Sequence, residues 1–197
     1  MPRSGGILAG MEGDFLGGQL LIAMPGIGDT RFERAVILIC AHDSQHAMGV
    51  AVNRPVEGLT LPSLLEKLQI ASTIKVPADL VRIGGPVERE RGFVLHTGDY
   101  RSDFSLKIEG GLMLTATREV LEAMASHNQR PRRSFLALGY AGWGAGQLES
   151  EIRHNVWLTV EADEALVFDD DYETKWGRAI GKLGIDPNFL SAEAGEA

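Results

Sequence analysis

The sequence has only one cysteine, and it has no apolar run approaching the roughly 20 residues that span a bilayer. A single thiol excludes an internal disulfide. Cys40 lies within the apolar run AVILICA, where a cysteine behaves as a small buried hydrophobic residue. The N-terminal stretch MPRSGGILAGMEGDF is interrupted by glycine and acidic residues, so it lacks the apolar core of a signal peptide. These absences predict a cytoplasmic protein with no membrane association.

Positive charge is also scarce, with 19 Lys and Arg against 27 Asp and Glu and a formal net charge of -8. General attraction to nucleic acid depends on clustered Lys and Arg. The only dense basic cluster is NQRPRRS, with Arg130, Arg132 and Arg133, and no helix-turn-helix pattern or RNA-binding signature accompanies it. Direct DNA binding is therefore the weaker alternative, and the arginines are expected to form a solvated loop.

The length and composition predict one globular domain. A chain of 197 residues with 44% hydrophobic residues can bury a sizeable core without a disulfide or a metal. No repeat or low-complexity linker divides it. We expect a folded body over residues 17–190, with flexible segments at 1–16 and 191–197.

Short apolar runs predict more strands than helices. Strands are expected at 19–24, 35–41, 47–53, 81–85, 92–96, 112–115, 134–138 and 155–162, and the polar loop HDSQH predicts a hairpin between the second and third. One helix is expected to begin after a Thr60 cap, with Leu61, Leu64, Leu65 and Leu68 on its apolar face.

Two further helices are predicted over 115–127 and 172–183. The first would bury Val120, Leu121 and Met124, and the second would present Tyr172, Trp176, Ile180 and Leu183 before ending at Gly184. Because helical and hairpin connections are mixed, the expected fold class is a single α+β domain.

The stretch GYAGWGAGQLESEI follows a predicted strand and opens a helix, which is the position of a phosphate-binding loop. Its glycine spacing matches neither phosphate-loop pattern, and Glu149 and Glu151 would repel a phosphate. We expect the glycines to serve a turn and close packing under Tyr140 and Trp143. The alternative is a ligand or partner pocket that uses Trp143, Gln147 and Glu151.

Histidines offer weaker hypotheses. His42, Asp43 and His46 would need to fold back on one another to hold a metal, and no second ligand cluster is visible. His96 or His154 with a nearby carboxylate would suit a hydrolase-like enzyme, but a satisfied or surface histidine is the more common case. No catalytic residue, metal site or cofactor is therefore predicted.

Several blocks resemble, in the same order, those of the bacterial AlgH/YqgE family: LIAMPGIGDTRFERAVILICAH, AMGVAVNRP, GGPVERERGFVLHT, LALGYAGWGAGQLESEI and NVWLT, followed by the helix around Trp176. The resemblance implies a single complex α+β domain whose bifurcated mixed sheet forms a pseudo-barrel flanked by helices. It also implies the label of a transcriptional regulator, after a member linked to control of alginate synthesis, with no catalytic residue or cofactor. His46 stands where the family commonly has glycine.

Together these patterns predict a non-enzymatic regulatory or binding protein that acts through a small ligand or a protein partner. The hydrolase-like enzyme is the alternative. The candidate binding residues are those at strand ends and in the glycine-rich stretch: Asn53, Arg54, Gly84, Gly85, Tyr140, Trp143, Gln147 and Glu151.

Overall fold

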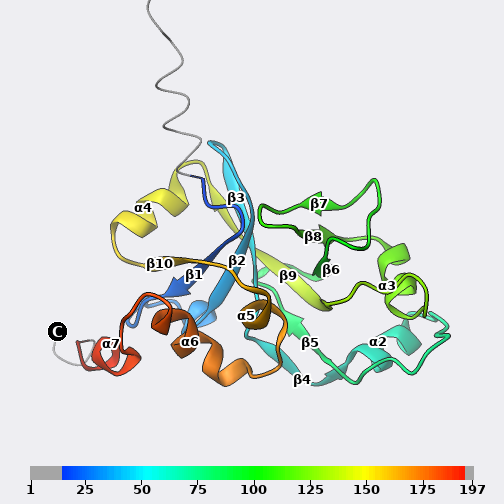
Figure 1. Ribbon diagram of the computed structural model, residues 1–197. Helices are drawn as coiled ribbons and strands as arrows, with labels where there is room; N and C mark the ends of the chain where they lie inside the picture. The colour runs from blue at the N-terminus through cyan, green and yellow to red at the C-terminus, as the bar shows by residue number, and fades with distance from the viewer. Residues whose placement is uncertain (1–14, 194–197) are drawn as a thin grey trace, which may run out of the picture.

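One sheet of ten strands organises the computed structural model, which describes residues 15–193 (Figure 1). The strand order is β10-β1-β2-β3-β9-β6-β8-β7, with β5 beside β9 and β4 beside β5. The strands pair in antiparallel fashion except for β5 and β9, which are parallel. The predicted α+β class with a mixed, divided sheet is confirmed. The segments expected to be flexible at 1–16 and 191–197 lie largely outside the described residues.

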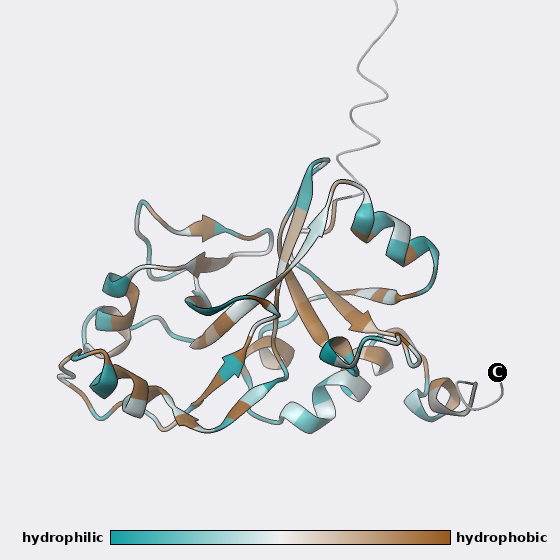
Figure 2. Ribbon diagram, turned by 180° about the vertical axis from the view of Figure 1, so that it is seen from behind, coloured by the Kyte–Doolittle hydropathy of each residue, from teal (hydrophilic) through white to brown (hydrophobic). Residues whose placement is uncertain are grey.

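The first arm of the sheet contains β1 (Gln19–Ala23), β2 (Val36–His42), β3 (His46–Ala51) and β10 (Trp157–Glu161). Its strands are apolar on both faces, as continuous hydrophobic runs predict. Along β2, Leu38 joins the largest core cluster, whereas the neighbouring Ile37 and Ile39 join a second cluster on the other face. Figure 2 shows these central strands as the most hydrophobic part of the chain.

The second arm contains β6 (Val87–Thr97), β7 (Leu106–Lys107) and β8 (Leu112–Thr115). Beside it lie α2 (Leu61–Lys67), α3 (Arg118–Met124), β4 (Pro55–Thr60) and β5 (Leu80–Ile83). Thr60 caps α2 as predicted, because its hydroxyl accepts a hydrogen bond from the Ser63 N–H. The predicted apolar face is too long, however: α2 ends at Lys67, and Leu68 is 39% exposed.

The glycine-rich stretch is mostly strand rather than turn, which corrects the sequence prediction. β9 (Ser134–Gly144) continues through it, pairing with β6 over its first half and with β3 over its second half. Only Gly146, at φ +71°, turns the chain into α4 (Gln147–Arg153). Pairing with β6 and β3, which are distant in the sequence, keeps this stretch within a strand, and local turn propensity cannot reveal such pairing.

The second half of the prediction for these glycines, close packing, is correct. A Cβ on Gly85 would lie 2.1 Å from the Tyr140 carbonyl carbon, and one on Gly84 would lie 2.2 Å from the Gly139 carbonyl oxygen. Gly139 itself has φ +75°. The β5 and β9 backbones therefore approach more closely than any side chain would allow.

The C-terminal third packs helices on the first arm. α5 (Glu164–Phe168), a 3₁₀ turn at Tyr172–Thr174 and α6 (Lys175–Gly181) precede α7 (Pro187–Glu193), and a further 3₁₀ turn lies at Thr30–Phe32. The single helix expected over 172–183 is thus divided into a 3₁₀ turn and α6. Trp176 and Ile180 are buried as predicted, whereas Leu183 is exposed. No helix among the described residues is long and apolar enough to cross a membrane.

Replacing Gly85 by Ala is expected to lower the free energy of unfolding by about 2 kcal/mol or more, because the new methyl group would overlap backbone atoms that cannot rotate away. Gly142→Ala is the matched control in β9, since its Cβ would meet only the Tyr140 ring at 3.4 Å. Urea unfolding of both variants measures the difference. Equal stabilities would show that the close approach is not required.

Candidate functional site

A groove of about 690 Å³ opens between the two arms of the sheet. Phe93 of β6 and Leu114 of β8 line it and belong to the largest core cluster, while Met48 of β3 and Tyr140 of β9 line it and pack against that cluster. The groove is therefore the open end of the core of the half-barrel. Barrel mouths of this kind are frequent binding sites.

Exposed apolar side chains gather at this groove. Among the described residues six large hydrophobic side chains are exposed, and three of them line it: Val87 (37% exposed), Phe104 (77%) and Leu106 (41%). The charged residues in the lining are Glu88 and Arg91, which form a 3.5 Å ion pair at the surface. A concentrated apolar patch with a polar rim is typical of an interaction site.

Tyr140 is the sequence-predicted candidate that belongs to the groove most clearly. Its ring meets Phe93 edge to face at a centroid distance of 5.7 Å, and the Arg91 guanidinium lies 5.0 Å from the centre of the Phe93 ring. These contacts fix an aromatic surface inside the lining.

Trp143, Glu151 and Gln147 instead hold α4 against the sheet. The indole N–H groups of Trp143 and Trp157 both donate to Glu151 Oε1, at 3.3 and 3.1 Å. Gln147 Oε1 accepts from the Gly144 N–H at 3.0 Å. Trp143 contributes to the groove lining, but it is only 6% exposed. The indole N–H groups, Glu151 Oε1 and Gln147 Oε1 are therefore used in hydrogen bonds within the protein.

Asn53 and Arg54 lie at a different cavity, of about 860 Å³, which Tyr172 and Trp176 also line. Asn53 accepts from the Val36 N–H and donates to the Arg34 carbonyl, and Arg54 donates to the Glu33 carbonyl. These bonds secure the loop before β2. Gly84 and Gly85 allow the close approach of two backbone segments and line neither cavity. The eight candidate residues therefore do not form one site.

The sequence is similar to proteins of one known family. The AlgH-like family model matches residues 20–188. The chain belongs to the AlgH-like family. It is 62% identical over 187 residues to a UPF0301 protein of Caulobacter vibrioides, covering 94% of this chain and 96% of that protein. A UPF0301 protein of Rhodospirillum rubrum is 50% identical over 183 residues, covering 93% of this chain and 95% of the relative.

Solved structures agree with this assignment. The solution structure of the AlgH protein from Pseudomonas aeruginosa matches with a TM-score of 0.74 and 37% identity, covering both chains completely. A crystal structure of a protein from Corynebacterium diphtheriae matches with a TM-score of 0.67 at 20% identity, over 91% of each chain, and so shares the fold. The resemblance predicted from the sequence blocks is confirmed.

The two histidines of the metal hypothesis, His42 and His46, lie in different surroundings. His42 Nδ1 accepts from the Leu16 N–H, and its Nε2 lies 2.7 Å from Glu149, so the ring ties β2 to α4. His46 is exposed on the hairpin beside Asp43. No group of three or more possible metal ligands occurs among residues 15–193.

The two histidines of the enzyme hypothesis do not pair with carboxylates. His154 is exposed and contacts the Ser150 carbonyl, while the neighbouring Glu151 accepts from the indoles. His96 is completely buried and contacts Thr97 and Thr115. Neither ring therefore forms the histidine–carboxylate pair that the hydrolase-like alternative requires.

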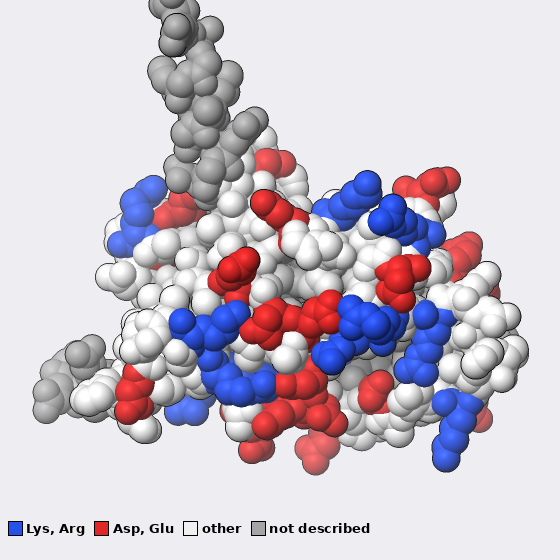
Figure 3. Space-filling view, in the orientation of Figure 1, with Lys and Arg blue, Asp and Glu red and all other residues white. Residues whose placement is uncertain are grey.

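Opposite charges alternate in a band across one face of the AlgH-like fold (Figure 3). Arg132 pairs with Glu164 at 2.7 Å, and Lys182 pairs with Asp163 at 2.8 Å. Arg133 also lies 3.9 Å from Glu164. The basic loop that raised the question of DNA binding is thus partly neutralised by α5, which removes much of its attraction for phosphate.

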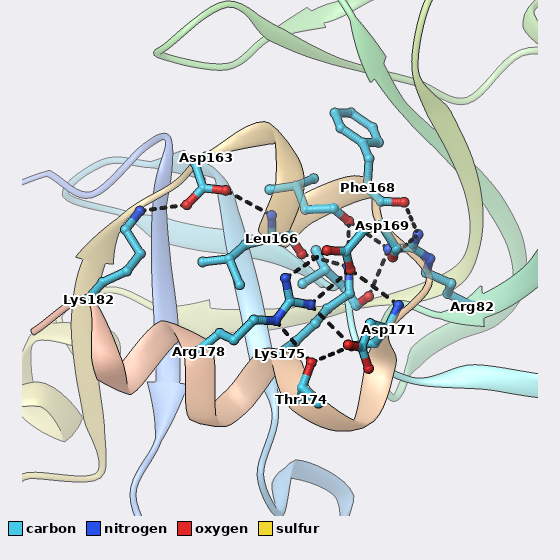
Figure 4. Close-up of polar contacts among 12 residues, drawn as sticks. Arg82, Asp163, Leu166, Phe168, Asp169, Asp171, Thr174, Lys175, Arg178 and Lys182 are labelled. Carbon is cyan, nitrogen blue, oxygen red and sulfur yellow. Dashed lines mark hydrogen bonds and ion pairs between the residues drawn. The ribbon is translucent and has the colours of Figure 1, made fainter. Parts of the chain in front are cut away.

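Two buried cations, Arg82 and Lys175, were not predicted from the sequence. Arg82 donates to the carbonyls of Val52, Val167 and Phe168, and Lys175 donates to that of Leu166 at 2.6 Å (Figure 4). Both cations therefore satisfy carbonyl groups at the C-terminal end of the short helix α5, where the helix dipole also favours positive charge. Isolated basic residues give no periodic signal, so the sequence did not reveal the arrangement.

Asp169 balances this cluster. Its carboxylate forms two hydrogen bonds with Arg178, at 2.7 and 2.9 Å, and lies 3.3 Å from Lys175 Nζ. The bonds to Arg178 lower the pKa of Asp169 to about 2. Burial, followed by the charge of Arg82, lowers the pKa of Lys175 to about 8.

Asp169→Asn is expected to lower the free energy of unfolding by at most about 2 kcal/mol at neutral pH, allowing for the partial exposure of the carboxylate. Since the folded pKa is below the unfolded value of 3.8, this contribution is complete above about pH 5 and is lost as the pH falls towards 2. Urea unfolding of both proteins across this range measures the gap. The exposed Asp170→Asn is the control, and a gap that persists at pH 2 would contradict the assignment.

Glu151→Ala is expected to destabilise the fold by about 1 to 3 kcal/mol, because the indole N–H groups of Trp143 and Trp157 would lose their shared acceptor. Glu151→Gln keeps a carbonyl acceptor and should cost less. Urea unfolding followed by tryptophan fluorescence compares the two variants. If both were as stable as the parent, Glu151 would be free for a ligand, as the sequence hypothesis proposed.

Proposed function

We propose that this AlgH-like protein is a non-enzymatic binding protein whose groove takes an extended segment of a partner protein. The observation that carries the proposal is the continuity between the largest core cluster and an exposed apolar patch at Val87, Phe104 and Leu106. An inserted apolar side chain would extend a core that is already packed on its other sides.

The form of the lining favours a protein segment over a small molecule. Pockets for small molecules bury most of the ligand surface, whereas Phe104 and Leu106 stand exposed at the rim. Leu106 also lies on β7, the last strand in the sheet order. An extended segment can pair with such an edge and direct alternate side chains into the groove.

A regulatory role, of the kind that the family resemblance implies, would then act through this partner. Direct contact with DNA is the less supported route, because Arg132 and Arg133 lie against Glu164 and the chain carries a net charge of -8.

The test uses two phenylalanines of similar exposure, Phe104 at the groove and Phe189 on α7, which are 77% and 71% exposed. A photo-crosslinking phenylalanine analogue is placed at each position in cells. We expect position 104 to capture one defined protein that position 189 does not capture. That protein is then purified, and its affinity for the parent chain is measured.

Phe104→Ser should weaken this affinity at least about tenfold, as loss of a central apolar anchor does, whereas Phe189→Ser should leave it within about twofold. Equal effects of the two variants would refute the groove as the binding surface. A small molecule retained in native mass spectra and lost on Phe104→Ser would also contradict the choice of a protein partner.

A further inference from the structure

β9 has different neighbours along its two sides. Ala137 and Leu138 pair with both β5 and β6, so these two strands lie on opposite sides of β9. β3 lies on the same side as β5, because the Ala51 N–H at the end of β3 donates to the Gly84 carbonyl just after β5, at 2.8 Å. The half of β9 that pairs with β3, residues 141–144, therefore has its other side turned toward the β6 side (Figure 1).

That other side is an open strand edge beside the groove. The pairing of β6 with β9 ends at Val87 and Tyr140, and no strand among residues 15–193 pairs with the β6 side of β9 beyond this point. Val87, Tyr140 and Gly142 all line the groove, and Gly142 is exposed. The open edge of β9 therefore borders the groove.

The hydrogen bonds at the β2–β3 hairpin decide which backbone groups face this edge. His46 uses its N–H and its carbonyl for bonds to Asp43, and the Gly144 N–H donates to Gln147 Oε1. The paired residues His46 and Gly144 therefore do not bond to each other. Bonded and non-bonded pairs alternate in an antiparallel ladder, so Gly142 does not bond to β3 either. Its N–H and C=O point to the open edge.

The space beside Gly142 on the groove face is apolar and unfilled. A Cβ at Gly142 would meet only the Tyr140 ring, at 3.4 Å. Met48, which is paired with Gly142, and Tyr140 both pack against the largest core cluster. Neighbouring side chains on adjacent strands share one face of a sheet. A residue beside Gly142 on an added strand would therefore direct its side chain into these apolar surroundings, and a large or aromatic side chain would cover the glycine.

The charged side chains that line the groove are already paired. Glu88 lies 3.5 Å from Arg91, and His46 lies 3.2 Å from Asp43. The groove therefore offers a ligand one backbone N–H, one backbone C=O and apolar side chains. An uncharged extended peptide is complementary to all three.

The open edge is also short. Val87 takes the place beside Tyr140 at one end, and Gln147 occupies the Gly144 N–H at the other. Phe104, from the other arm, lines the same groove. An edge of this length beside such a wall suits one extended segment better than the sheet edge of a second folded copy.

We propose that the partner segment adds to β9 at Gly142, rather than to the two-residue strand β7, and places a large apolar or aromatic side chain over this glycine. The inference rests on the proposed function of the groove. It adds the backbone anchor of the site and the kind of residue that the partner must supply.

The open edge is tested first in the parent protein alone, by amide hydrogen exchange resolved by residue and corrected for intrinsic rates. The Gly142 N–H should exchange at least about a hundredfold faster than the N–H groups of Ala141 and Trp143, which point to β3. Similar protection of all three amides would show that the edge is already covered, and would overturn the proposal.

The same experiment on a saturated complex with the protein captured at position 104 tests the pairing. The Gly142 amide should slow at least about tenfold, whereas the Gly144 amide, which already donates to Gln147, should change by less than about twofold. A Gly142 amide that stays unprotected in the complex would show that the partner binds through side chains alone.

Two glycine variants test the side-chain space. Gly142→Leu would fill the place of the partner's side chain and should weaken affinity at least about tenfold. Gly144→Leu is the matched control: it is exposed, its Cβ would meet only Gln147 at 3.9 Å, and it lies outside the groove lining, so affinity should stay within about twofold. If Gly142→Leu fails to fold, Gly142→Ala should still weaken affinity about threefold. Equal affinities of the folded variants would overturn the proposal.

The outcomes separate this inference from the function on which it rests. If no protein is captured at position 104, both fail. If a protein is captured and Phe104→Ser weakens its binding but Gly142→Leu does not, the groove stands and the pairing with β9 fails. Capture of a second copy of this chain would overturn the choice of an extended partner segment.

Discussion

The close approach of the β5 and β9 backbones at Gly84, Gly85 and Gly139 is the constraint on which the rest of the structure depends. It brings β5 alongside β9 at the place where β9 exchanges β6 for β3 as its neighbour. One strand can therefore belong to both arms of the sheet. The groove exists because the arms diverge from this point, and a Cβ on any of the three glycines would separate them.

One side of the resulting core is covered by helices, and another side is open at the groove. Arg82, two residues before Gly84 on the same chain segment, reaches the carbonyls at the end of α5, and Lys175 completes their coordination from α6. These buried cations fix the C-terminal helices over one side of the largest cluster. The side lined by Phe93 and Tyr140 receives no such cover from the described residues. The proposed binding role rests on this open apolar side of the core.

The hydrogen bonds behind the second arm add a polar layer to this apolar design. Thr115 and Ser105 hydrogen-bond to each other, whereas their neighbours Leu114 and Leu106 line the groove, so a pair of short strands separates a polar layer from an apolar surface. Fully satisfied buried networks specify position strongly. The bonds among His96, Thr115 and Ser105 therefore fix β8 and the residues just before β7 relative to β6.

Local sequence patterns were sufficient for much of the fold. The apolar run around Ile37, the Thr60 cap and Gly184 after α6 each reflect chemistry within a few residues, and each was predicted correctly. The course of β9 was not predicted, because it is set by pairing with β3 and β6, which are distant in the sequence. Tyr140 could be named as a candidate because it lies in the glycine-rich stretch. Phe104 and Leu106, which line the same groove, carry no such local signal. Only the folded sheet brings their exposed side chains to one place.

The most direct measurement of the central claim is an NMR titration of the labelled protein with a peptide that contains the crosslinked site of the captured partner. We expect shifts concentrated on the groove, at Met48, Phe93, Leu114 and Tyr140, with little change around Asn53 and Arg54 in the other cavity. Shifts confined to that second cavity, or spread evenly over the surface, would contradict it.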